Sequence, residues 1–305
     1  MSVLTRKSIN PNIIFHDYDP GKRKFDTYNY FDVCKMVNGF KNLFQEHGAK
    51  HGETVLLNTV SHYHVMCSFI AASELGLVLT IPTLMYHLNN EGNYENARIK
   101  ALLPFNYFYE KDLEYFGRTE SDDQRAFLDF FVKVCDKTII GEPHNFKSNK
   151  KIYCEDDSIH NRCTSSGTTG KPKVIEHTQN FILELSKRNA KSLGKNFIMN
   201  RTFNHGASLA TFYLPALVSE KTENVYFYSY DRATKPIDPI GNYTDSIQFL
   251  YPNQLEEFYK KHGKCPNLTA YLLCAIRPEW KKYIEEGAFK DIVSMYGTTE
   301  VLGPV

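Results

Sequence analysis

The spacing of apolar residues predicts alternating helices and strands along most of this 305-residue chain. Between Asn29 and Gly48 the apolar positions recur every three or four residues, which predicts a helix with one apolar face. That face comprises Phe31, Cys34, Val37, Phe40, Leu43 and Phe44. A short apolar strand is expected at 54–57, a second helix at 61–75 and a second strand at 77–81.

The rest of the chain continues this alternation, apart from residues 1–26, which are expected to form an irregular lead-in. Thr178 is expected to cap a helix, because apolar residues recur at helical spacing just after it. Further strands are predicted at 138–140, 173–176, 197–200, 225–228, 247–250, 268–274 and 292–295, and further helices at 209–218, 253–261 and 278–286.

Short turns between helices and strands indicate parallel sheets connected through helices. We therefore predict an α/β fold of two αβ subdomains, with mainly parallel sheets and flanking helices. The polar stretch 141–151, with Pro143 and several Asn and Ser residues, is the best candidate boundary. It divides the chain into a first subdomain at 1–150 and a second at 151–305.

Composition narrows the functional classes. Hydrophobic residues make up 42% of the chain and charged residues 23%, as in soluble globular proteins, and the net charge of +1 gives no field for nucleic acid. The most apolar region, 67–85, contains Glu74, which would cost about 3 kcal/mol at the centre of a bilayer, so no membrane span is predicted. Seven cysteines without a C-x-x-C pair indicate reduced thiols in a cytoplasmic protein.

The stretch 164–173 carries the strongest chemical signal in the chain. It combines hydroxyls, two glycines and two lysines: Thr164, Ser165, Ser166, Gly167, Thr168, Thr169, Gly170, Lys171, Pro172 and Lys173. Glycine lets backbone N–H groups approach a ligand closely, and hydroxyls and lysines add donors and positive charge, so this mixture suits a polyphosphate. It is not a Walker A loop, because Ser165 replaces the first glycine and Pro172 follows Lys171.

A second motif near the end of the sequence, Tyr296-Gly297-Thr298-Thr299-Glu300, supports a family assignment. Together and in this order, the two stretches resemble the phosphate-binding signature and the YGxTE motif of the adenylate-forming enzymes, the superfamily of acyl-CoA synthetases, peptide-synthetase adenylation domains and luciferases. The resemblance implies that a carboxylate attacks the α-phosphate of ATP to give an acyl-adenylate and pyrophosphate. ATP and Mg²⁺ are the implied cofactors, and coenzyme A or a carrier-protein thiol is an implied acceptor.

The resemblance also implies roles for individual residues. Residues 164–171 would bind the phosphates with Lys173, Tyr296 would lie against adenine beside Gly297 and Thr298, Thr299 would donate to the α-phosphate, and Glu300 would bind Mg²⁺. Lys173, Thr299 and Glu300 are the candidate catalytic residues. His205 and Gly206 are candidates for the carboxylate pocket, although their spacing departs from the family's H-x-x-G, and a core histidine is an equal alternative.

Two departures from the family pattern affect these expectations. Leu273-Cys274-Ala275 replaces a small Gly-Gly-Ala turn beside adenine, and the sequence stops at Val305, before the family's C-terminal lid domain. We therefore expect only the N-terminal portion of such an enzyme, with low activity by itself and a second polypeptide as a candidate partner. The alternatives are a truncated, non-catalytic nucleotide-binding or subunit-interaction module, or one piece of a split ligase.

Overall fold

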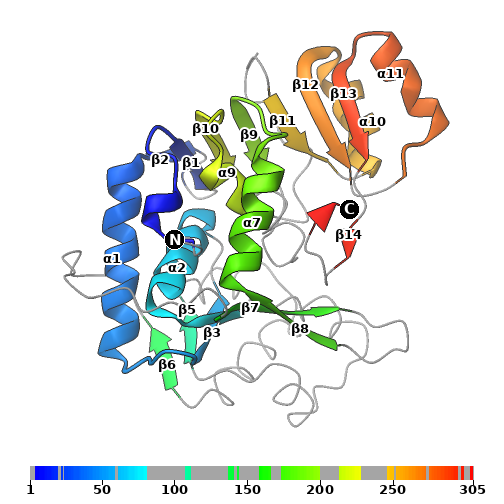
Figure 1. Ribbon diagram of the computed structural model, residues 1–305. Coiled ribbons are helices and arrows are strands. Elements are labelled where there is room, and N and C mark those ends of the chain that lie inside the picture. Colours follow the sequence, from blue (N-terminus) through cyan, green and yellow to red (C-terminus); the bar gives the residue numbers. More distant parts are fainter. Residues whose placement is uncertain are drawn as a thin grey trace, which may run out of the picture. The chain divides into compact units, whose positions relative to one another are not determined.

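The protein forms two compact units, each with its own large β-sheet (Figure 1). The computed structural model describes residues 4–19, 22, 24–58, 61–80, 107–110, 137–140, 143, 158–165, 173–199, 213–227, 246–250, 252–272, 275–294, 297–298 and 303–304. Unit 1 comprises Met1–Ser8, Phe31–Glu184 and Asn204–Gly206, and unit 2 comprises Ile9–Tyr30, Leu185–Phe203 and Ala207–Val305.

The sheet of unit 1 has six strands in the order β6-β5-β3-β4-β7-β8. They are β3 (Thr54–Asn58), β4 (Val78–Thr80), β5 (Tyr107–Glu110), β6 (Lys137–Ile140), β7 (Ile159–Ser165) and β8 (Lys173–Thr178). All neighbouring strands are parallel except β7 and β8, which form an antiparallel pair. The edge strand β8 is therefore held in the sheet by β7.

Two helices, α1 (Tyr30–Glu46) and α2 (His62–Leu75), follow the predicted pattern closely. Ser61 caps α2 by accepting a hydrogen bond from the backbone N–H of His64, and Gly76 ends the helix with a left-handed backbone at φ 67°. Every residue of α2 is buried, as its apolar sequence requires. In α1, by contrast, the predicted apolar face is only partly buried, since Phe31 is 64% exposed.

The sheet of unit 2 has seven strands in the order β13-β12-β11-β9-β10-β1-β2. They are β1 (Ile14–Asp19), β2 (Lys24–Tyr28), β9 (Asn196–Met199), β10 (Asn224–Phe227), β11 (Ser246–Phe249), β12 (Cys265–Leu272) and β13 (Phe289–Ser294). Only β1 and β2 pair in antiparallel fashion. The described helices of this unit include α9 (Leu214–Val218), α10 (Pro252–His262) and α11 (Lys281–Glu285), together with the short 3₁₀ turn η3 (Pro278–Trp280). Helix α7 (Gln179–Ala190) begins in unit 1 and ends in unit 2.

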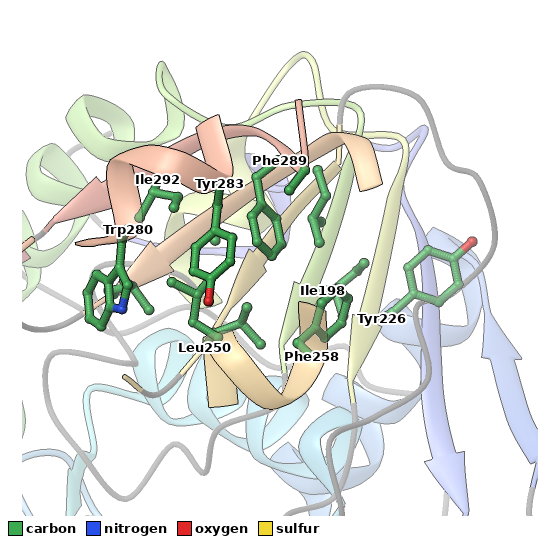
Figure 2. Packing of buried hydrophobic residues seen from close by; sticks show 13 residues of the cluster. Ile198, Tyr226, Leu250, Phe258, Trp280, Tyr283, Phe289 and Ile292 are labelled. Atoms are coloured by element: carbon green, nitrogen blue, oxygen red, sulfur yellow. The ribbon is translucent and has the colours of Figure 1, made fainter. Parts of the chain in front are cut away.

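An apolar cluster holds the β11–β13 end of this sheet together (Figure 2). Phe258 of α10, Trp280 of η3 and Phe289 of β13 are almost fully buried in it. The rings of Phe258 and Phe289 lie 6.0 Å apart. Because burying a large apolar side chain contributes about 1.5–3 kcal/mol, this cluster is the main source of stability at this end of unit 2.

The structure confirms the predicted α/β class with mainly parallel sheets, but it corrects two details. The described residues within 1–26 are not an irregular lead-in, because they include η1 (Arg6–Ser8), the strand β1 and the start of β2. The units also differ from a division at residue 150. The reason is strand pairing: β1 pairs with β10 of unit 2, whereas β7 pairs with β4 of unit 1.

Candidate functional site

The hydroxyl- and glycine-rich stretch connects the two strands of an antiparallel hairpin, β7 and β8. The pairing runs through Thr164 opposite Val174 and ends with Ser165 opposite Lys173. Of the predicted phosphate-binding residues, Thr164, Ser165 and Lys173 therefore lie at the ends of the two strands. Residues 166–172, which connect them, lie outside the described residues.

The middle of this hairpin is bridged by one arginine. Arg162 Nε donates to Oε1 of Glu176, directly opposite on β8, at 2.7 Å. Its Nη1 donates to Oγ1 of Thr54 on β3 at 2.6 Å. The same side chain thus contacts the outermost strand β8 and the more central strand β3.

Helix α2 supports the base of the hairpin. The ring of His160 on β7 lies 4.1 Å from the ring of Phe69, and burial lowers the pKa of this histidine to about 3. The imidazole is therefore neutral at physiological pH. After β8, Gln179 accepts a hydrogen bond from the hydroxyl of Ser73 at 2.7 Å, and its backbone N–H donates to the carbonyl of Ser158.

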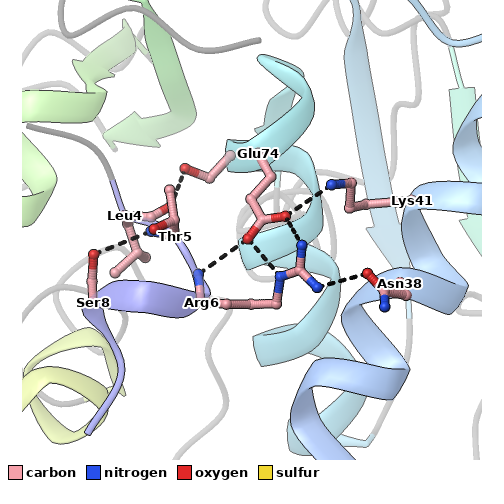
Figure 3. A network of polar contacts seen from close by, with 8 residues as sticks. Leu4, Thr5, Arg6, Ser8, Asn38, Lys41 and Glu74 are labelled. Carbon is pink, nitrogen blue, oxygen red and sulfur yellow. Dashed lines mark hydrogen bonds and ion pairs between the residues drawn. The ribbon is translucent and has the colours of Figure 1, made fainter. Parts of the chain in front are cut away.

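A buried ion network fixes α2 in turn (Figure 3). Glu74 accepts hydrogen bonds from Arg6 Nε and Nη2, both at 2.8 Å, and from Lys41 Nζ at 2.9 Å. Arg6 Nη1 also donates to Asn38 on α1 at 2.7 Å. Burial by itself raises the pKa of the Glu74 carboxyl, but the two cations outweigh burial, so the pKa lies below its usual value. Glu74, the acid inside the apolar stretch 67–85, therefore forms structural ion pairs with Arg6 and Lys41 that join η1, α1 and α2.

The second motif forms part of a much smaller hairpin. Gly297 and Thr298 form β14 (Gly297–Thr298), which pairs with β15 (Gly303–Pro304) in a two-stranded sheet. Tyr296, Thr299 and Glu300 lie outside the described residues, as do His205 and Gly206. Their roles in adenine, metal and carboxylate binding remain predictions.

The Arg162–Glu176 pair was not predicted from the sequence, although the sequence contains a signal for it. Both residues lie three positions outside the last hairpin pair, Ser165 and Lys173. Opposite charges placed symmetrically about a loop are expected to face each other when the flanking residues form a hairpin. The second partner, Thr54, is remote in sequence and is found only from the fold.

Comparison with known families confirms the predicted resemblance. Residues 10–305 match the family described as AMP-binding enzyme, so the chain belongs to that family. A comparison with curated proteins finds no match. Within the described residues, each helix is too short or too polar to cross a lipid bilayer.

Three solved structures illustrate the fold similarity. A MenE variant from E. coli with bound OSB-AMS is 15% identical with a TM-score of 0.66, and the match covers 92% of this chain and 57% of that one. The inhibitor-bound N-terminal domain of FACL13 from Mycobacterium tuberculosis is 15% identical with a TM-score of 0.66, covering 97% of this chain and 74% of that one. An adenylation domain of a keto acid-selecting NRPS module, bound to a keto acyl adenylate, is 12% identical with a TM-score of 0.75, covering 100% of this chain and 61% of that one.

These likenesses concern the fold, which is that of the N-terminal domain of adenylate-forming enzymes. The chain spans 57% of the length of the MenE structure.

Proposed function

We propose that this chain carries out, or supplies the ATP-binding part of, the activation of a carboxylate as an acyl-adenylate. The observation that carries the proposal is the β7–β8 hairpin, in which Ser165 and Lys173 flank a hydroxyl- and glycine-rich connection in a chain of the AMP-binding family. The similar fold of an adenylation domain bound to a keto acyl adenylate supports the same reaction class.

The donor set on and between these strands suits a triphosphate. Residues 164–171 supply hydroxyls and glycine N–H groups, and Lys173 supplies a cation at the end of β8. A hydrogen bond to a charged group contributes about 1.5–3 kcal/mol, so several of them together would hold the β- and γ-phosphates. In the proposed step a carboxylate oxygen attacks the α-phosphorus and the bond to pyrophosphate breaks. Positioning and charge neutralisation supply most of the catalysis.

The second motif is proposed to serve the α-phosphate and the metal. Thr299 donates to the α-phosphate, Tyr296 lies against adenine, and Glu300 provides the carboxylate oxygen that Mg²⁺ prefers. Mg²⁺ would neutralise charge on the phosphates. His205 and Gly206 are proposed to line the carboxylate pocket.

The acceptor and the setting of the reaction are part of the same proposal. Coenzyme A or a carrier-protein thiol takes up the acyl group, and a second polypeptide supplies the C-terminal domain of the family. The odd number of cysteines, without a C-x-x-C pair, supports a cytoplasmic protein.

Exchange of labelled pyrophosphate into ATP tests the proposal, with a panel of carboxylic acids that includes 2-keto acids. We expect acid-dependent exchange that falls about 100-fold in Lys173→Met and in Glu300→Gln, since each removes a charged group from the reacting phosphates or their metal. Lys195→Met is the matched control, because Lys195 is a 54% exposed lysine paired with Glu223 in unit 2.

The outcomes separate the alternatives. Calorimetric binding of Mg·ATP without exchange favours a binding module, and exchange restored by a polypeptide carrying the family's C-terminal domain favours a split ligase. Absence of both exchange and Mg·ATP binding would overturn the proposal.

A further inference from the structure

The geometry assigns a positioning role to Arg162: we infer that this residue fixes the hairpin whose tip carries the proposed phosphate-binding loop. The link to ATP rests on the proposed function. The bracing of the hairpin does not, and it can be measured without any nucleotide.

Strand pairing shows what such a brace would hold. Strand β8 lies at the edge of the sheet and its only described strand neighbour is β7. Strand β7 is itself joined to β4 through only two described register pairs, Leu79 with Asn161 and Thr80 with Arg162. Within the described residues, the two strands that carry the loop are therefore attached to the rest of the sheet over a short length of backbone.

Arg162 lies where one side chain can reach across β4 to the next strand. Residues paired laterally in a sheet point their side chains to the same face, so Arg162, Glu176 and Thr80 share one face. Thr54 lies on that face too, because it is two residues before Leu56, the partner of Thr80. The guanidinium therefore passes over β4 to reach β3, two strand spacings or about 10 Å away.

The chemistry of the side chain fits this task. A guanidinium is planar and presents several N–H groups in fixed directions, so Nε can bond to Glu176 while Nη1 bonds to Thr54. The inner partner is well shielded, with Thr54 2% exposed, whereas the Glu176 side chain is 45% exposed. A lysine at this position offers all its donors from one nitrogen, so it could bond to both partners only if both lay within reach of that single atom.

The position along the hairpin determines what the brace controls. Arg162 and Glu176 lie three residues from Ser165 and Lys173, about 10 Å from the strand ends. Pivoting of β8 at this point would move Lys173 and the other loop donors away from their partners on a phosphate. Because a displacement of one ångström in such donors weakens binding, the brace is expected to set the affinity for the triphosphate.

The first measurement follows amide hydrogen exchange of the backbone in 159–165 and 173–178 without nucleotide. We expect Arg162→Met to raise exchange there about three- to tenfold, with Arg162→Lys intermediate and Thr54→Val raising it less. Glu176→Gln should also raise it. The matched control, Glu223→Gln, alters an exposed carboxylate paired with Lys195 in unit 2 and should leave these segments unchanged. Unchanged exchange in Arg162→Met would overturn the inference.

The second measurement is the dissociation constant for Mg·ATP, by calorimetry well below the unfolding temperature. We expect Arg162→Met to weaken binding about three- to tenfold, because displaced donors fit the phosphates less well, and Arg162→Lys to recover part of it. In turnover assays the KM for ATP should rise while the KM for the acid stays constant. If Arg162→Met speeds amide exchange but leaves the affinity for Mg·ATP unchanged, Arg162 only stabilises the hairpin, which would contradict the positioning role. If the wild type binds no Mg·ATP, the proposed function fails. Amide exchange without nucleotide would still show whether Arg162 braces the hairpin.

Discussion

The two hairpins that carry the family motifs are built very differently. The β7–β8 hairpin is part of a six-stranded sheet, is bridged by Arg162, and rests on α2 through His160. The β14–β15 hairpin has two register pairs, Gly297 with Pro304 and Thr298 with Gly303, in a sheet of its own. A two-stranded hairpin is only marginally stable alone, so within the described residues the first motif has a scaffold and the second has little.

The difference suggests a division of labour within the proposed reaction. A loop that binds phosphates gains affinity from being preorganised, because less conformational freedom is lost on binding. A motif on a hairpin with few pairs would lose more of this freedom when a ligand binds, so the proposed contacts with nucleotide and metal are expected to contribute less affinity. Four experiments test this contrast, in decreasing order of expected effect.

The strongest test removes the ion network that fixes α2 beneath the first hairpin. Glu74→Ala leaves the cations of Arg6 and Lys41 without their buried partner, and we expect unit 1 to lose about 3–5 kcal/mol of stability. Amide exchange in α2 measures the loss. Glu223→Ala, which breaks an exposed pair with Lys195, should cost less than about 1 kcal/mol. Equal effects of the two variants would contradict the role given to the network.

Amide exchange in the wild-type protein compares the hairpins directly. We expect Cys163 and Ile175 to exchange at least about 100-fold more slowly than Thr298, because their strands are held by the sheet and by Arg162. Saturating Mg·ATP should slow exchange more in 297–304 than in 159–178. Equal protection of the two hairpins without nucleotide would remove the contrast.

Acid should weaken the support of the first hairpin through His160. Its pKa is about 3 in the folded protein and about 6.5 when unfolded, so the unfolded state binds the proton first as pH falls. The stability contributed by the neutral ring is complete above about pH 6.5 and declines by about 1.4 kcal/mol per pH unit down to about pH 3.

His160→Leu tests this, because it should reduce the pH dependence of unit 1 stability by about half, measured by amide exchange in β7. The other half is expected from His62 in α2, since burial lowers its pKa to about 3 as well. Phe69→Leu is the control, since it disturbs the same contact without removing a titrating group. An equal slope in His160→Leu and wild type would show that another group controls the acid response.

The smallest expected effect concerns the turn between α2 and β4. Gly76 has a left-handed backbone, φ 67°, that favours glycine, so Gly76→Ala should destabilise unit 1 by about 1 kcal/mol. Gly287, at φ 65°, is the matched position in unit 2, where an added Cβ meets nothing within 4 Å. Each variant should speed exchange in its own unit only. A Gly76→Ala protein as stable as wild type would show that the strain is relieved elsewhere.

Local sequence patterns determined most of the described elements and supplied the prediction for the candidate site. The period of three and four predicted α1, and the helix predicted at 61–75 matches α2 to within one residue, because apolar periodicity acts within a few residues. The hydroxyls, glycines and lysines of 164–173 indicated a phosphate-binding connection, because that chemistry is set by residue types close together in the chain.

Only the tertiary structure decided how these pieces combine. The pairing of β1 with β10 places the predicted irregular lead-in inside a sheet, and it joins residues far apart in sequence. The reach of Arg162 to Thr54 does the same. The buried pairing of Glu74 with Arg6 and Lys41 is of the same kind. Such contacts depend on which strand lies next to which, and residue spacing along the chain does not carry that information, because strand pairing is settled by the packing of the whole sheet.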